Sequence, residues 1–353
     1  MKLNLYVSFV LAGVMLGASA AQAAEIKWKG DMRVRYAYEN PNNQGSIASS
    51  TLQTGRERLR YRLRYGFEAA PNDQVTVKVR IASGIGGNFK SPNADLAMSN
   101  FSNVAQSTFI DNAYLVYEPY DSNMTLMAGK MENPFKYTMI MFDSDIHFPG
   151  IASAWKFGDK GQVKWLLGGF VATENNSATA GTEDDLLLAS QLSSVFDLGN
   201  DATLGIYGSY YSLTRGFDRI LDGIVEFKPN KDIALLADAF NNFRTDNNTS
   251  GALGYYVQGS ANLNDGLKAS LGYGAHFSNA FDSTMVFSDS DFENFIGSNN
   301  NQGFKGNVTF IPFKDNELGI TVFSCSNIND VAGNANGTKG SAMTVLADWL
   351  VKL

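Results

Sequence analysis

Hydrophobic and polar residues alternate one by one over several long stretches of the chain. In residues 57–68, leucines and tyrosines alternate with four arginines, Arg58, Arg60, Arg62 and Arg64. Successive side chains of a strand point to opposite faces of a sheet, so these arginines lie about 6.7 Å apart on one face. An arginine turned toward lipid costs about 2–4 kcal/mol near the middle of a bilayer. The pattern predicts a strand whose apolar face meets any apolar surroundings and whose arginine face meets water.

The segments on either side of this strand repeat its pattern. Residues 26–39 and 75–82 also alternate, and each carries basic residues on its polar face. Because neighbouring strands of one sheet share their two faces, the polar faces combine into one basic wall. The predicted wall consists of Arg33, Arg35, Arg58, Arg60, Arg62, Arg64, Lys78 and Arg80.

Sixteen alternating segments can be counted, and the connections between them alternate in length. Long connections fall at 83–107, 133–149, 174–184, 244–250, 278–302 and 328–338, and short turns at 119–123, 158–161, 198–201, 229–232, 264–266 and 314–316. Membrane barrels have long extracellular loops and short periplasmic turns. We therefore predict an all-β fold, a transmembrane antiparallel β-barrel of sixteen strands with both termini on the periplasmic side. Because 108–118, 185–197 and 233–243 alternate poorly, counts two lower or higher stay open.

The N-terminus and the composition agree with an exported barrel. An apolar run and the small residues Ala21-Gln22-Ala23 predict a signal peptide over residues 1–23 and a barrel domain over 24–353. Losing Lys2 changes the net charge from −7 to −8. A single cysteine, Cys325, excludes an intramolecular disulfide. Secreted sandwiches and lectin-like barrels also use alternating strands and remain the alternative fold.

Residue types that carry chemistry are sparse. The two histidines, His147 and His276, have no recognisable nucleophile signature, so no enzyme activity is expected. The acidic residues of the connection 278–302 lack the order of a calcium loop, which favours solvated side chains: Asp282, Asp289, Asp291 and Glu293. Nothing predicts a cofactor, a metal or a nucleic-acid partner.

Two stretches resemble a known family. Residues 128–135, Ala-Gly-Lys-Met-Glu-Asn-Pro-Phe, and residues 142–152, from Phe142 to Ala152, resemble a segment of the putative-porin family of Gram-negative outer membranes. The last segment, 342–353, resembles the terminal strand by which such barrels are recognised for assembly, although it ends in Leu353 instead of an aromatic residue. The resemblance implies an outer-membrane homotrimer among lipids and lipopolysaccharide, inserted by the barrel-assembly machinery, through which small hydrophilic solutes diffuse.

The resemblance to the porin superfamily also implies that the third extracellular loop, 133–149, folds into the lumen. Its acidic residues, Glu132, Asp143 and Asp145, would then face the basic wall. Opposed charges across a narrow aqueous pore select solutes by size and charge. The arginines favour anions, either as a weak ionic preference or as a specific ladder for phosphate or other anions. A non-conducting structural or adhesive barrel is the alternative function.

Overall fold

The structure, a computed structural model, describes residues 25–42, 55–85, 91–96, 106–158, 162–174, 184–243, 252–281, 299–329 and 340–353. The predicted signal peptide lies outside these residues, as do the four acidic residues of the connection 278–302. Among the residues that are described, no helix is long and apolar enough to cross a membrane.

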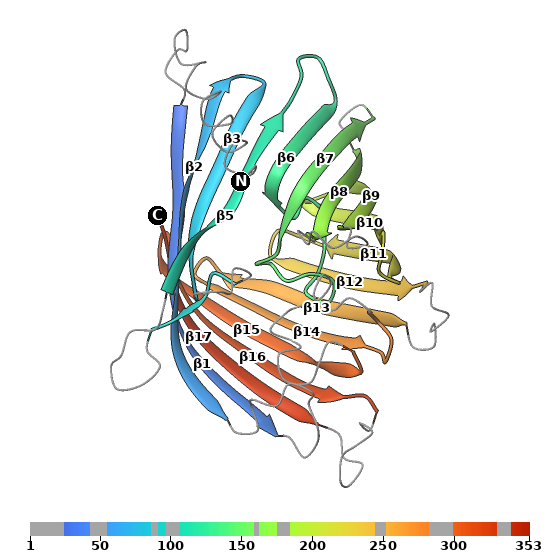
Figure 1. The fold of residues 1–353 in the computed structure, drawn as a ribbon. Helices are drawn as coiled ribbons and strands as arrows, with labels where there is room; N and C mark the ends of the chain where they lie inside the picture. The colour runs from blue at the N-terminus through green and yellow to red at the C-terminus, as the bar shows by residue number, and fades with distance from the viewer. Residues whose placement is uncertain are drawn as a thin grey trace, which may run out of the picture.

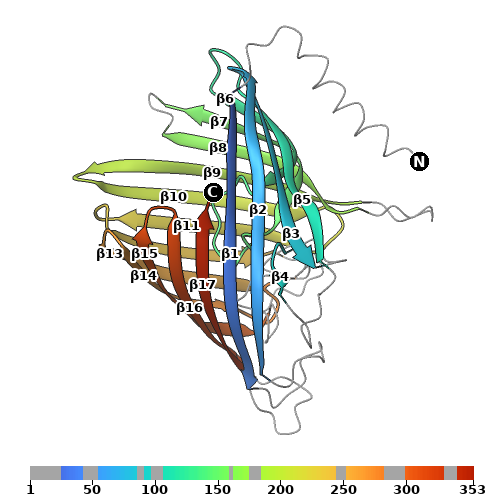
Figure 2. The same ribbon diagram turned by 90° about the vertical axis from the view of Figure 1, so that its left-hand side faces the viewer.

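Sixteen antiparallel strands form a closed barrel (Figure 1). Closure occurs where β1 pairs with both β2 and β17 (Figure 2). The strands are β1 (Glu25–Asn42), β2 (Arg56–Asn72), β3 (Val75–Ile85), β5 (Gln106–Tyr117), β6 (Met124–Glu132), β7 (His147–Phe157), β8 (Val163–Thr173), β9 (Asp185–Gly199), β10 (Ala202–Leu213), β11 (Arg219–Lys228), β12 (Ile233–Asn242), β13 (Leu253–Asn264), β14 (Leu267–His276), β15 (Asn301–Phe313), β16 (Asn316–Asn327) and β17 (Ser341–Lys352).

The prediction of sixteen strands is confirmed. The three segments that alternate poorly in sequence form β5, β9 and β12. Both ends of the described barrel lie on the rim with the short turns, since Asp31 near the start pairs with Lys352 at the end. The alternation is therefore enough to locate strands even where it is interrupted.

A short additional strand, β4 (Ala94–Asp95), lies beside β2. β3 pairs with β2 only as far as the Arg64–Ala82 position, and β4 pairs with the next part of β2, at Arg60 and Tyr61. A piece of the second long connection thereby returns to the wall and places Asp95 opposite Arg60.

The outer face of the barrel is apolar and carries all four tryptophans. Trp28, Trp155, Trp165 and Trp349 are each 38–58% exposed. Each stands within three residues of the strand end on the short-turn rim. Tryptophan is enriched at the boundary between lipid and water, so the four mark one edge of a membrane-embedded band.

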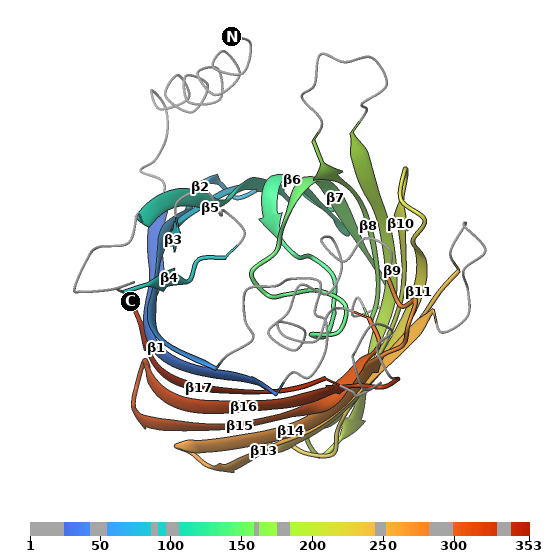
Figure 3. The same cartoon turned by 60° about the horizontal axis from the view of Figure 1, so that its bottom comes forward.

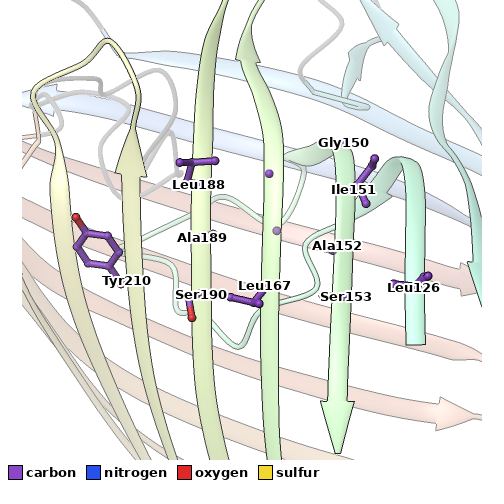
Figure 4. A pocket seen from close by; sticks show the side chains of 12 residues that line it. Leu126, Gly150, Ile151, Ala152, Ser153, Leu167, Leu188, Ala189, Ser190 and Tyr210 are labelled. Carbon is purple, nitrogen blue, oxygen red and sulfur yellow. The ribbon is translucent and has the colours of Figure 1, made fainter. Parts of the chain in front are cut away.

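The apolar band is hollowed over strands β6 to β10, with an open groove of about 760 Å³ (Figure 4). It is lined by small residues such as Gly169 and Ser153 together with Leu126, Leu167 and Leu188. The outer face is therefore apolar inside this groove as well as around it.

The main hydrophobic core lies inside the barrel. The chain between β6 and β7 lies within the ring of strands (Figure 3). Its residues Phe135, Ile140, Met141 and Phe142 are at most 4% exposed and pack against inward side chains of β7 to β13. We call residues 133–146 the inward segment. It covers the wall across the lumen from the arginines.

Candidate functional site: the basic wall and the inward segment

The predicted basic wall lies on the inner faces of β1, β2 and β3. The register sets Arg33 directly opposite Arg62 and Arg35 opposite Arg60. The side chains of these four arginines are only 8–13% exposed. Like charges this close and this shielded from water repel strongly unless anions lie between them.

Acidic residues of the same wall supply those anions, and most of them are shared by two bases. Asp31 binds Arg62 at 3.0 Å and Arg64 at 2.7 Å. Glu39 binds Arg56 and Arg58 in the same way. Each shared acid links two bases by charge-assisted hydrogen bonds, and these links together form a ladder along the wall.

Two further acids are shared by two bases each. Asp95 of β4 lies 3.1 Å from Arg60 and 3.7 Å from Arg58. Asp348 of β17 accepts hydrogen bonds from Arg35 Nε at 2.7 Å and from Arg35 Nη2 at 2.8 Å. The same carboxylate lies 4.0 Å from Arg33.

Near the short-turn rim the pattern includes lysines. Glu68 binds Lys29 at 2.8 Å and Lys78 at 3.3 Å, whereas Arg80 takes two acids, Asp111 and Glu132. Among the residues described in this wall, ten bases meet seven acids: Lys29, Arg33, Arg35, Arg56, Arg58, Arg60, Arg62, Arg64, Lys78 and Arg80 against Asp31, Glu39, Glu68, Asp95, Asp111, Glu132 and Asp348. Within these ion pairs the bases exceed the acids by three, and the nearby Asp145 offsets one of the three positive charges.

The three acidic residues predicted for the constriction take different places. Glu132 ends β6 and binds Arg80 at 2.7 Å. Asp145 reaches the wall through Asn93, whose amide donates to it at 3.4 Å and accepts from Arg33. Asp143 holds the turn of the inward segment itself, since its Oδ1 accepts from the Asp145 backbone at 3.0 Å. Burial raises the pKa of the Tyr137 hydroxyl, and the negative charges of Asp143 and Asp145 raise it further.

Four aromatic side chains anchor the inward segment to the wall of β7 to β10. Phe142 meets Phe148 and Tyr211 edge to face, each with ring centres 5.3 Å apart. Phe135 meets the Tyr211 ring at 5.8 Å. Edge-to-face contacts contribute about 0.5–1.5 kcal/mol each beyond burial.

Polar contacts fix the backbone of the inward segment. Gln191 of β9 accepts from the Lys136 N–H at 2.9 Å and donates to the Lys136 carbonyl at 2.8 Å. Lys136 Nζ binds Glu226 at 3.3 Å. A ring nitrogen of His276 lies 2.9 Å from the Ile140 carbonyl, and the Thr138 hydroxyl donates to Asp238.

Both histidines contact groups that position the inward segment or belong to the basic wall. His276 contacts the backbone of the inward segment, and His147 lies between Asp111 at 3.5 Å and Arg80 at 3.0 Å. In the described parts of the chain, no three histidine, cysteine or acidic side chains gather as metal ligands.

Several residues of this site do not belong to the set predicted from the sequence. Asp31, Glu39 and Asp348 share the strand face of the arginines, so their position in the alternation could have shown them. Asn93 and Asp95 come from a connection without periodicity and gave no signal. Two acids that stand in apolar columns, Asp222 between Ile220 and Ile224 and Asp238 before Phe240, were also detectable.

A sequence model of one protein family matches residues 32–224, more than half of the chain. That family is described as "Putative porin". The chain belongs to this family. No curated protein matches the sequence of this porin.

Solved structures similar to this porin include an outer membrane channel and another porin. The outer membrane channel DcaP of Acinetobacter baumannii is 18% identical, with a TM-score of 0.54 over 93% of this chain and 97% of that one. A triple mutant of the Rhodopseudomonas blastica porin is 10% identical, with a TM-score of 0.54 over 93% and 100%. At these identities the likeness concerns the fold.

Family and fold together indicate a porin channel of the outer membrane rather than an enzyme. The geometry agrees with this, because charged groups are concentrated on the inner face and apolar groups on the outer face. What the channel selects depends on the basic wall and on the inward segment that faces it.

Proposed function

We propose that this porin forms a water-filled pore through which small hydrophilic solutes and ions diffuse passively, with a preference for anions. The main support for this proposal is the ladder of ion pairs along the basic wall, in which ten bases share only seven acids. Each shared carboxylate leaves one of its two bases incompletely neutralised. A passing anion can replace part of that neutralisation without stripping the wall of its own pairs.

The reversal potential in a salt gradient across a planar bilayer tests this preference. The wild type should favour anions, and Arg60→Ala combined with Arg62→Ala should favour them less. Asp31→Asn should favour them more, because it frees Arg62 and Arg64. Opposite shifts from opposite charge changes would not follow from a general disturbance of the wall.

Lys314→Gln is the matched control, since Lys314 lies in the exposed turn between β15 and β16. It removes one positive charge and should leave the reversal potential unchanged. A reversal potential equal in all four proteins would place selection elsewhere. Folded barrels without conductance would instead support a structural or adhesive role.

The proposal includes export and assembly. Cleavage after Ala23 should give a mature N-terminus at Ala24, which N-terminal sequencing would read directly. Insertion by the barrel-assembly machinery into lipid and lipopolysaccharide, and a homotrimeric state, follow from the porin resemblance. Native mass spectrometry of detergent-extracted protein should show three copies, and a single copy would contradict the trimer.

A further inference from the structure

Two carboxyl groups meet inside the barrel wall beneath the inward segment. Asp222 of β11 and Asp238 of β12 point inward from adjacent strands, and each residue is 2% exposed. The register sets Asp238 opposite Ile224, two residues along β11 from Asp222. Diagonal neighbours of this kind on adjacent strands lie about 7–8 Å apart, which is close enough for the two carboxyl groups to interact.

This pair has almost no donors. The Thr138 hydroxyl of the inward segment donates to Asp238 Oδ2. The other three carboxyl oxygens accept no hydrogen bond from any residue that the structure describes. Ser209 of β10 and the backbone N–H of Gly223 are the donors that lie near Asp222.

Neighbouring charged and titratable groups do not neutralise the pair. No described lysine or arginine forms an ion pair with either carboxyl. The Tyr211 hydroxyl comes from β10, and His276 comes from β14 with a ring nitrogen on the Ile140 carbonyl. Further along β11, Glu226 is bound to Lys136.

Two buried carboxylates in contact cannot both remain ionised without a cation between them. The surroundings are packed with large side chains, and Tyr211, Ile220, Ile224 and Phe240 are each at most 4% exposed. A proton is the one cation that needs no additional space. It also converts the repulsive contact into a hydrogen bond from one carboxyl to the other.

We propose that Asp222 and Asp238 bind one proton between them, and that this pair positions the inward segment through Thr138. Losing the proton leaves two like charges beneath the segment. Water must then enter to solvate them, and the segment loses its close contact with β11 and β12. The docked arrangement is the protonated one, so raising the pH past the point of proton loss should widen the pore.

Infrared difference spectroscopy of the folded barrel tests the proton itself. The wild type at neutral pH should show the C=O stretch of a buried carboxylic acid, shifted in D2O. The band should be absent from Asp222→Asn combined with Asp238→Asn, whose amides preserve size and hydrogen bonding. Asp232→Asn, in an exposed turn, should keep it. A wild type without the band, or a double variant that retains it, overturns the proposal.

Single-channel conductance from neutral to alkaline pH tests the positioning. Wild type and Asp232→Asn should rise along the same curve, whereas the double variant should remain flat. A double variant that follows the wild-type curve contradicts the positioning role. This measurement rests on the proposed conductance, but the infrared measurement does not, so a failure of the channel function would be distinguished from a failure of the proton site.

Discussion

Removing the Phe142 ring should release the inward segment while leaving the barrel intact. Phe142 is fully buried, and its edge-to-face partners Phe148 and Tyr211 belong to the strands. A buried phenylalanine replaced by alanine costs about 3–5 kcal/mol. The interstrand hydrogen bonds do not involve this side chain, so the loss falls on the docking of the segment. A cost of about 4 kcal/mol raises the undocked population by roughly a thousandfold.

Trypsin provides the assay, because Lys136 lies in the segment and Gln191 holds both its N–H and its carbonyl. Cleavage after Lys136 requires an open segment, and its rate follows the open population when closing is fast. Mass spectrometry of the fragments should show this cut much faster in Phe142→Ala than in wild type.

Phe243→Ala is the matched control, since Phe243 is 54% exposed at the end of β12. It should cleave like wild type. The heat-dependent electrophoretic mobility typical of folded barrels must be retained in both variants. A folded Phe142→Ala barrel whose Lys136 bond is cut less than about ten times faster than in wild type would refute docking by this ring.

Three further outcomes are expected. Gln191→Ala removes two hydrogen bonds to the inward segment, each of about 0.5–1.5 kcal/mol, so hydrogen exchange at the Lys136 amide should accelerate about 5- to 150-fold. Unchanged exchange would exclude this contribution of Gln191. Gly66→Ala would place a Cβ 2.1 Å from the Val79 carbonyl oxygen and should lower the free energy of unfolding by about 1–3 kcal/mol. Gly306→Ala, where the added Cβ meets open space, should leave it unchanged. Equal melting temperatures of the two variants would contradict the close approach at Gly66. Glu39→Gln should strengthen anion preference as Asp31→Asn does, and a shift toward cations would speak against shared neutralisation.

The sequence was informative about strands because alternation is a local property. The residues of each strand show by their own alternation which side chains share a face. The long connections interrupt this alternation where the strands end. Segments such as 185–197 alternate less clearly because their inward positions are apolar too. Leu187 and Ala189 face the aromatic cluster of the inward segment rather than water.

Partners within the site could not be read in this way, since pairing depends on register and closure. Asp348 is far from Arg35 in sequence and meets it only because β17 pairs with β1. Asn93 reaches Arg33 from a connection without repeating pattern. The basic wall was therefore foreseen as a row of cations, and its internal neutralisation was not.

Closure of the barrel between β1 and β17 also determines which alignment of these strands can persist. Asp348 faces inward to Arg35, while its neighbour Trp349 faces outward opposite Val34. A slip by one residue would reverse both side chains. Asp348 would enter the acyl chains, Trp349 would enter the lumen, and Arg35 would lose its carboxylate. A single dipeptide in β17 thus disfavours misaligned closure on both faces at once.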